Sequence, residues 1–333
     1  MKNLKYGIIG LGYFGEKHAE VMSNMRGVEL AAVSTRKHER LEEIAKRFNV
    51  PGIYADYRDL LLNKEIDAVS IVTHMNDHRA ITIDALKAGK HVFLEKPMAG
   101  TVEDCDAIIR AAESAAGSIF MVGHICRFDT RVSLAKTAID EGRIGRIVSM
   151  HATRNLPANI SGGVLDKISP LMGDGIHDTD IMLWLTGSRI KTVYAQNVRV
   201  RHFKYPDIGW AMYRFENDAV GVIETVWLLP ENTSFQIDAR MEIIGTEGAI
   251  YIDCGNSGLT INDKSGTVKP DTAYWPGLLG KRVGVLRDEL CYFTDCISQG
   301  KKPDIITPDE SRMAVSVMCA AEKSAETDSI VRV

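Results

Sequence analysis

Two short stretches carry side chains suited to acid–base chemistry. In the first, Glu95-Lys96-Pro97 directly follows an apolar run that is typical of a buried strand. In the second, Asp174 and His177 stand three residues apart in a segment with helical spacing, so their side chains can face one another. A carboxylate beside an imidazole orients it and supports a positive charge on it, as a general base near neutral pH requires. Each stretch also has a plainer interpretation, with Lys96 as a solvated surface lysine and Asp174 as a helix cap that bonds His177.

A glycine motif near the start of the chain predicts a dinucleotide site. The apolar run of residues 4–9 leads into the motif, and a helix is expected from there to about Asn24. In this context the first glycine permits the turn, the second lets the backbone approach a pyrophosphate, and the third allows close packing of helix on strand. The helix N-terminus favours the anion. The glycines could instead serve only to make a tight turn. The candidate cofactor residues here are Gly10, Gly12, Tyr13, Phe14 and Gly15.

The end of the second predicted strand, residues 28–34, indicates which cofactor is preferred. An acidic residue about 20 positions after the glycines would hold a ribose 2′-hydroxyl. That position is Thr35, and the loop Ser34-Thr35-Arg36-Lys37 contains no acid. Two cations could pair with a 2′-phosphate, which favours NADP(H) and leaves NAD(H) possible. The plainer interpretation is that Arg36 and Lys37 belong to a solvated loop.

Further polar residues follow the apolar strand of residues 66–72. Ligands of open α/β sheets bind outside the carboxyl ends of the strands, so Thr73, Asn76 and His78 are candidate cofactor residues. His78 could equally be a helix-start residue with a local hydrogen bond. Gly89 is expected to end the following helix in a left-handed conformation.

The order of elements predicts an α/β chain of two domains. Strands and helices alternate up to residue 122, which predicts a doubly wound parallel sheet, a Rossmann dinucleotide-binding domain over 1–122. Residues 123–333 contain many closely spaced strands and few helices. They predict an α+β domain with a large, mostly antiparallel open sheet for substrate binding and oligomerisation.

Composition narrows the class of protein. The 333 residues carry 40 basic and 44 acidic side chains with no block of one sign, which argues against nucleic-acid and membrane-surface partners. The six cysteines lack CxxC spacing, so no metal site is predicted. The first residues show no basic region followed by an apolar stretch, and no run approaches about 18 apolar residues, so a cytoplasmic protein is expected.

Taken together, these motifs resemble the glucose-fructose oxidoreductase, inositol dehydrogenase and MocA (Gfo/Idh/MocA) family along nearly the whole chain. The matching stretches are the glycine motif, Ile66-Asp67-Ala68-Val69 with His78, Ala88-Gly89-Lys90-His91-Val92, Glu95-Lys96-Pro97, Gly123 with Arg127-Phe128, the Asp174 and His177 segment, Gly245-Thr246-Glu247-Gly248 and the helix around Phe293. The resemblance implies nicotinamide-dependent oxidation of sugar or cyclitol hydroxyls. It also implies a homodimer or homotetramer formed through the C-terminal sheet.

The resemblance also implies roles for individual residues. Lys96 would be the active-site lysine, His177 the general acid/base and Asp174 its helper, while Glu95, Lys96 and Pro97 would border the cofactor. Pro97 matches a proline that often follows a cis bond. The family usually has the aspartate four residues before the histidine, where this chain has Gly173. On a helix both spacings share the histidine's face, so the pair is expected to survive with altered geometry.

The expected reaction is hydride transfer between a secondary hydroxyl or ketone of a sugar, sugar derivative or cyclitol and the nicotinamide ring. It needs a base for the hydroxyl proton and a cation for the developing alkoxide, which are His177 and Lys96. Arg127, Arg154 and Asn155 are candidate substrate-binding residues, with ordinary surface positions as the alternative. Two other functions are carried by members of the family. One is a glycosidase that retains its cofactor and acts by transient oxidation, and the other is a non-catalytic nicotinamide-binding regulator.

Overall fold

The structure is a computed structural model that describes residues 3–255 and 257–333, and its contacts form two compact units. The first unit comprises Met1–Ile125 and Tyr274–Arg312, and the second comprises Cys126–Ala273 and Met313–Val333. The sequence predicted a single division at residue 122. The structure differs because residues 274–312 return to the first unit.

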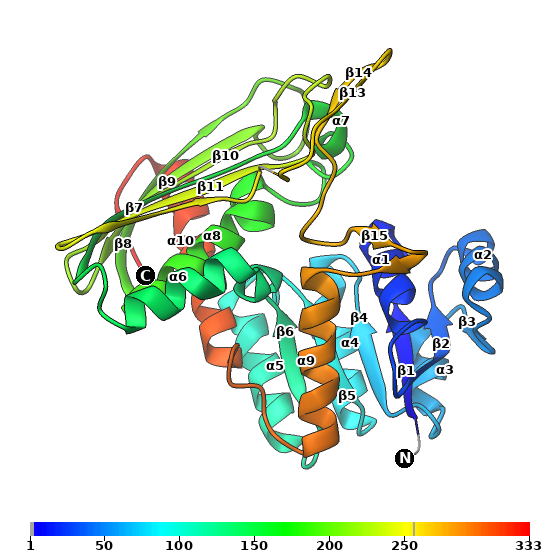
Figure 1. Ribbon diagram of the computed structural model, residues 1–333. Coiled ribbons are helices and arrows are strands. Elements are labelled where there is room, and N and C mark those ends of the chain that lie inside the picture. Colours follow the sequence, from blue (N-terminus) through cyan, green and yellow to red (C-terminus); the bar gives the residue numbers. More distant parts are fainter. Residues whose placement is uncertain (1–2, 256) are drawn as a thin grey trace. The chain divides into compact units, whose positions relative to one another are not determined.

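The first unit is built on a six-stranded parallel sheet with the order β3-β2-β1-β4-β5-β6 (Figure 1). Every residue of β4 is buried, as expected in a parallel sheet that is covered on both faces. The predicted Rossmann sheet is therefore confirmed. Its strands are β1 (Leu4–Ile9), β2 (Val28–Ser34), β3 (Gly52–Tyr54), β4 (Ala68–Ile71), β5 (His91–Glu95) and β6 (Phe120–Gly123). Its helices are α1 (Tyr13–Met22), α2 (His38–Phe48), α3 (Tyr57–Leu62), α4 (Met75–Lys87), α5 (Val102–Ser114) and α9 (Val285–Gln299).

Aromatic packing explains why the later segment joins this unit. Phe293 of α9 is fully buried and meets Phe93 of β5 and Tyr6 of β1 edge-on, with ring centroids 5.6 and 6.5 Å apart. These contacts between distant parts of the sequence remove large apolar surfaces from water. Before α9, a short hairpin pairs β15 (Gly277–Leu278) with β16 (Lys281–Arg282). The helix expected around Phe293 is α9, which begins after this hairpin at Val285.

Glycine ends α4 as predicted. Gly89 has φ of +72°, and the N–H of Lys90 donates to the carbonyl of Ala85. This left-handed residue turns the chain into β5, whose carboxyl end carries Glu95. The Lys96–Pro97 peptide bond that follows is cis.

The second unit contains a seven-stranded sheet with the order β12-β11-β7-β10-β9-β8-β17. Only β7 and β10 pair in parallel; the other neighbours are antiparallel, which confirms the predicted α+β arrangement. Side chains of β9 alternate between buried and exposed, so one face of the sheet is open. Helices α6, α8 and α10 lie on the other side (Figure 1).

The strands of this sheet are β7 (Ile147–Asn155), β8 (Ile190–Val198), β9 (Ile208–Phe215), β10 (Val220–Val226), β11 (Asp238–Gly245), β12 (Ala249–Asp253) and β17 (Val331–Arg332). A separate hairpin joins β13 (Ile261–Asp263) and β14 (Gly266–Val268). The helices are α6 (Thr130–Asp140), α7 (Ala158–Ser161), α8 (Ile176–Thr186) and α10 (Pro308–Thr327), of which α10 crosses the division between units. A 3-10 turn spans Ile125–Phe128, and a π-helical turn over Leu171–Gly175 precedes α8. Among the described residues, no helix has the length and apolarity to cross a membrane.

Candidate active site and dinucleotide pocket

The turn between β1 and α1 requires glycine at two positions and leaves space at a third. Gly10 has φ of +98°, and a Cβ there would lie 2.4 Å from the carbonyl oxygen of Val72. A Cβ on Gly15 would lie 1.9 Å from the carbonyl oxygen of Gly10, so neither position accepts a side chain. A Cβ on Gly12 would meet nothing within 4 Å. Gly12 is also the N-cap of α1 and provides no capping side chain, so the first N–H groups of this helix are available to an anion.

A pocket of about 780 Å³ opens beside this turn, at the carboxyl ends of β1, β2 and β4. Its size suits a cofactor. The predicted cofactor residues that line it are Gly10, Gly12, Tyr13, Ser34, Thr35, Arg36, Lys37 and Thr73. Leu11, Arg40, Tyr57 and Asp77, which were not predicted, also line it. Its lining does not include Phe14, Gly15, Asn76, His78, Glu95, Lys96 or Pro97.

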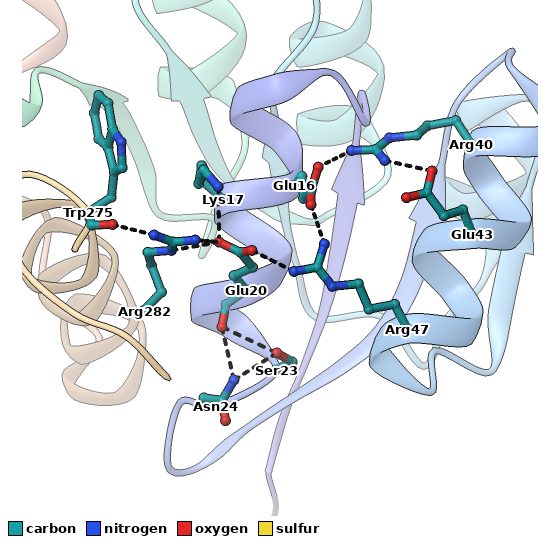
Figure 2. Close-up of polar contacts among 10 residues, drawn as sticks. All are labelled: Glu16, Lys17, Glu20, Ser23, Asn24, Arg40, Glu43, Arg47, Trp275 and Arg282. Atoms are coloured by element: carbon teal, nitrogen blue, oxygen red, sulfur yellow. Dashed lines mark hydrogen bonds and ion pairs between the residues drawn. The ribbon is translucent and has the colours of Figure 1, made fainter. Parts of the chain in front are cut away.

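The cations of this pocket differ in their partners. Arg40 donates from Nε to the carbonyl of Leu11 over 3.1 Å, and its guanidinium also pairs with Glu16 and Glu43 (Figure 2). Arg36 is exposed and has a longer ion pair of 3.6 Å with Asp77. Arg40 therefore holds the glycine turn. The sequence pattern did not indicate this role, because Leu11 and Glu16 lie 29 and 24 positions away from Arg40 in the chain.

Glu95 lies in a buried network that joins α1 to β5. His18 places Nε2 3.0 Å from Glu95 and Nδ1 3.1 Å from the hydroxyl of Ser70, which also bonds the hydroxyl of Tyr6. A neutral His18 satisfies both neighbours by donating at Nε2 and accepting at Nδ1. The network thus fixes Glu95 from within the fold. His18 was not recognised in the sequence, where it stands as a single histidine on a helix.

His78 connects the proline segment to the turn after β4. Its Nδ1 lies 2.8 Å from the carbonyl oxygen of Pro97 and its Nε2 3.2 Å from that of Thr73. Burial lowers the pKa of His78, so the neutral ring with one N–H is favoured. Asn76 is exposed on the first turn of α4, and Lys96 is half-buried. His78 therefore positions the backbone on which Lys96 stands.

In the second unit, Asp174 and His177 have different neighbours. Asp174 lies in the π-helical turn and accepts a hydrogen bond of 2.9 Å from the indole N–H of Trp227. His177 is buried in α8, and the neighbour at its Nδ1 is the thiol of Cys126, 3.6 Å away. Burial raises the pKa of the Cys126 thiol to about 12, so it stays protonated.

The π-helical turn changes the direction of the shifted aspartate. Each residue of an i→i+5 turn advances by a smaller angle than in an α-helix, so a residue three positions before His177 lies further from the histidine's face than α-helical spacing would place it. A Cβ on Gly173 would lie 2.7 Å from the ring of Trp227, which leaves little room for an aspartate there. Trp227 therefore occupies the side of the turn at Gly173 and holds the carboxylate at Asp174. The sequence pattern contained no signal for either contact.

Arg154 and Asn155 are engaged within the second unit. Arg154 makes two hydrogen bonds of 2.9 Å to the carboxylate of Asp178, and both side chains are buried. Burial raises the pKa of Asp178, although Arg154 acts in the opposite direction. Asn155 donates to Glu224 and accepts from the backbone N–H of Val226, each over 2.7 Å. These bonds tie β7 to α8 and to β10.

Arg127 is held in a similar way. Its guanidinium donates two hydrogen bonds to Asp180, over 2.9 and 2.7 Å, and lies 5.2 Å from the ring centroid of Trp184. Both charged side chains are 1% exposed. The acids Asp178 and Asp180 on α8 were missed in the sequence. The sequence did contain a signal for them. Acidic residues on an otherwise apolar, buried helix need cationic partners, because charged side chains are seldom buried unless they are paired.

Replacing Arg127 by methionine is expected to destabilise the protein by about 3–5 kcal/mol, because Asp180 would remain as an uncompensated buried charge. Urea denaturation measures this change. The control is Arg240→Met, which removes a half-exposed pair with Asp238 and should cost about 1 kcal/mol or less. An unchanged stability of Arg127→Met together with weakened substrate binding would instead support the predicted substrate role.

Two family descriptions match most of the chain. Residues 4–124 match an oxidoreductase family with an NAD-binding Rossmann fold, and residues 132–251 match the GFO/IDH/MocA C-terminal domain. The chain belongs to the Gfo/Idh/MocA family. The resemblance inferred from the sequence motifs is thereby confirmed, and this protein is an oxidoreductase with an NAD-binding domain.

Two relatives and one solved structure are similar to this Gfo/Idh/MocA oxidoreductase along nearly its whole length. Myo-inositol 2-dehydrogenase of Thermotoga maritima is 28% identical over 97% of this chain and 96% of its own. The NAD(+)-dependent scyllo-inositol 2-dehydrogenase of Bacillus subtilis is 28% identical over 96% of this chain and 94% of its own. The apo structure of scyllo-inositol dehydrogenase from Lactobacillus casei is 25% identical, covers 99% of this chain and 98% of its own, and superposes with a TM-score of 0.87.

The glycine turn of this Gfo/Idh/MocA oxidoreductase fits a dinucleotide. The open space at Gly12 admits a pyrophosphate close to the backbone, and the uncapped N-terminus of α1 provides N–H donors for it. Gly10, Gly12 and Tyr13 would hold the pyrophosphate, and the loop at Ser34–Lys37 would face the adenosine ribose.

Gly12→Val is expected to fold with an unchanged free energy of unfolding but to bind NAD(H) and NADP(H) at least tenfold more weakly, since its side chain would occupy the phosphate position. Gly15→Ala is the comparison, because its Cβ strikes backbone and should cost roughly 2–3 kcal/mol of stability. Thermal unfolding and nicotinamide fluorescence titration measure the two effects. Full cofactor affinity in Gly12→Val would contradict this placement of the pyrophosphate.

Proposed function

We propose that this oxidoreductase transfers a hydride between a secondary hydroxyl or ketone of a cyclitol, sugar or sugar derivative and a nicotinamide cofactor. The observation that carries the proposal is the glycine turn, with an open Gly12 at the N-terminus of α1 beside a cofactor-sized pocket. The inositol dehydrogenase activities of two relatives that cover nearly the whole chain support the substrate class. The bound cofactor would accept or give the hydride, and the chain would bind it and move the hydroxyl proton.

We assign charge stabilisation and proton transfer in this reaction to Lys96 and His177. The Lys96 ammonium, on a segment fixed by His78 and by the Glu95 network, would stabilise negative charge on the substrate oxygen. The His177 imidazole would exchange the hydroxyl proton. Cys126 can donate to or accept from Nδ1, so it is compatible with either neutral form of the ring.

Asp174 is assigned to the substrate rather than to His177. Its Oδ2 accepts from Trp227, and Oδ1 has no hydrogen-bond partner within residues 3–255 and 257–333. Asp174 is half-buried, so part of the residue is open to solvent. We propose that Oδ1 accepts a hydrogen bond from a substrate hydroxyl and so orients the substrate.

The proposed cofactor is NADP(H), with NAD(H) as the weaker ligand. Among the cations of the pocket, Arg40 is occupied by two carboxylates, and Arg58 lies beside Asp56. Lys37 has no ion-pair partner among the residues that the structure describes, and Arg36 has only its long pair with Asp77. These two cations are therefore the ones that a 2′-phosphate could engage.

Arg36→Ser/Lys37→Ser is expected to raise the Kd for NADPH by roughly 10- to 100-fold, the loss of one or two charge-assisted hydrogen bonds. The Kd for NADH should change by less than about threefold, since NADH lacks the phosphate. Arg58→Gln is the matched control from the same pocket rim. Fluorescence titration of both cofactors measures the change. Tighter binding of NADH than of NADPH by the unmodified protein would overturn the assignment.

One substrate screen tests the proposed reaction. Reduction of NAD⁺ and NADP⁺ is followed with cyclitols, free sugars, sugar acids and nucleotide sugars. We expect reduction with a cyclitol or sugar. Release of a sugar without net cofactor reduction would support the cofactor-retaining glycosidase instead, and no turnover with any substrate despite cofactor binding would support the regulator.

Assembly and location are proposed on separate observations. The open face of the C-terminal sheet exposes Trp210 and Met212 of β9 and Tyr251 of β12. An apolar face of this kind suits a homodimer or homotetramer interface. The cytoplasmic location that the sequence led us to expect stays a proposal.

A further inference from the structure

The segment Tyr274–Arg282, here named the α1 clasp, is bound to the dinucleotide helix at two points. Near its start, the ring of Trp275 packs edge-on against Phe14 of α1, with centroids 5.4 Å apart and planes at 82°. At its end, Arg282 donates from Nε to the carboxylate of Glu20 over 2.6 Å (Figure 2). Arg282 also donates to the carbonyl of Trp275 over 2.6 Å, which closes the clasp on itself.

Glu20 is the centre of the charged contact. Its side chain is only 9% exposed, and it receives Arg282, Arg47 of α2 and, at 3.3 Å, Lys17. Arg282 is 21% exposed, so this pair is better shielded from solvent than an ordinary surface ion pair. Because Glu20 keeps Arg47 and Lys17 when Arg282 is removed, loss of Arg282 does not leave a lone buried charge.

The two contacts are made near opposite ends of α1. Phe14 stands in the first turn, next to Tyr13 and Gly12, which line the cofactor pocket. Glu20 lies near the other end of the same helix. On the α2 side, Arg47 contacts Glu16 and Glu20, and Arg40 contacts Glu16 (Figure 2). Arg40 also donates to the carbonyl of Leu11. The helix that presents its N-terminus to the pyrophosphate is thus braced by α2 on one side and by the α1 clasp on the other.

We propose that the α1 clasp is a positioning element for the cofactor, in which Trp275 and Arg282 hold the N-terminus of α1 in register with the pyrophosphate. Neither residue lines the pocket, so each acts through α1. Small displacements of a helix end weaken the bonds that its N–H groups make to an anion. The proposal rests on dinucleotide binding at the glycine turn and is independent of the substrate.

The test compares a ligand that has the pyrophosphate with one that lacks it. Arg282→Gln and Trp275→Leu are titrated with NADH and NADPH by nicotinamide fluorescence, and adenosine is titrated by competition. We expect the Kd of the dinucleotides to rise about tenfold and the Kd of adenosine to change less than about twofold. Arg282→Lys and Trp275→Phe should recover most of the affinity. Lys5→Gln is the control, because it removes an ion pair with Glu65 in the same unit without touching α1, and it should leave all three affinities within twofold of the unmodified protein.

The outcomes separate the clasp from general stability. Dinucleotide affinities within twofold of the unmodified protein in both folded variants would overturn the proposal. Equal weakening of dinucleotide and adenosine would also overturn it, because it would indicate loosening of the whole first unit. If Arg282→Gln does not fold, Trp275→Leu and Trp275→Phe decide the question. The unmodified protein is titrated first, so a failure of cofactor binding itself is recognised separately.

Discussion

Lys96→Met is expected to lower kcat by about 10³-fold while the Kd of the nicotinamide cofactor stays within about threefold. The methionine preserves most of the apolar stem of the lysine and removes only the ammonium group. Lys96 does not line the pocket at the glycine turn, so cofactor binding there should persist. The backbone of its segment is held by His78 and by the buried Glu95 network, which the substitution leaves untouched.

Steady-state turnover with the substrate found in the screen measures this effect, and fluorescence titration reports the cofactor. Lys87→Met, at the exposed end of α4, is the control and should retain activity within twofold. Turnover of Lys96→Met close to that of the unmodified protein would remove Lys96 from the reaction.

His177→Gln is expected to lower kcat by about 10²- to 10⁴-fold, the usual contribution of a positioned general base. Glutamine fills a similar volume and keeps polar atoms in this buried position, but it cannot take up the hydroxyl proton. Cys126 would retain a hydrogen-bonding neighbour, so the fold of α8 should survive.

Single-turnover measurements with saturating cofactor isolate the chemical step in His177→Gln, and circular dichroism checks the fold. His202→Gln changes an exposed histidine of the same unit and should leave the rate unchanged. If His177→Gln loses substrate affinity but retains kcat, His177 is a binding residue and another group moves the proton.

Much of the fold could be predicted because local patterns decide it. Apolar runs with no polar face indicate buried parallel strands, and alternation indicates a sheet with one open face. Gly89 and Gly10 adopt the positive φ values that their positions require. The return of α9 to the first unit could not be predicted, because its amphipathic stripe does not say which apolar surface it will meet.

The types of residue in the site could be predicted from the sequence, but their hydrogen-bond and ion-pair partners could not. The glycine turn and its loop were recognised because the chemistry of phosphate binding depends on backbone close to the motif. The candidate substrate-binding residues were Arg127, Arg154 and Asn155. In the structure they form hydrogen bonds within the second unit. A sequence reports a cation but not the carboxylate that folding brings to it.

The sequence by itself therefore determined the dinucleotide turn, the alternation of strands and helices in the first domain and the residue types offered for proton transfer, since each depends on patterns within short stretches. The tertiary structure alone decided that Trp227 holds Asp174, that Cys126 stands at His177, and that Glu20 receives Arg282. These contacts join residues that are 51 or more positions apart. Their energies depend on burial and geometry, which exist only after the chain has folded.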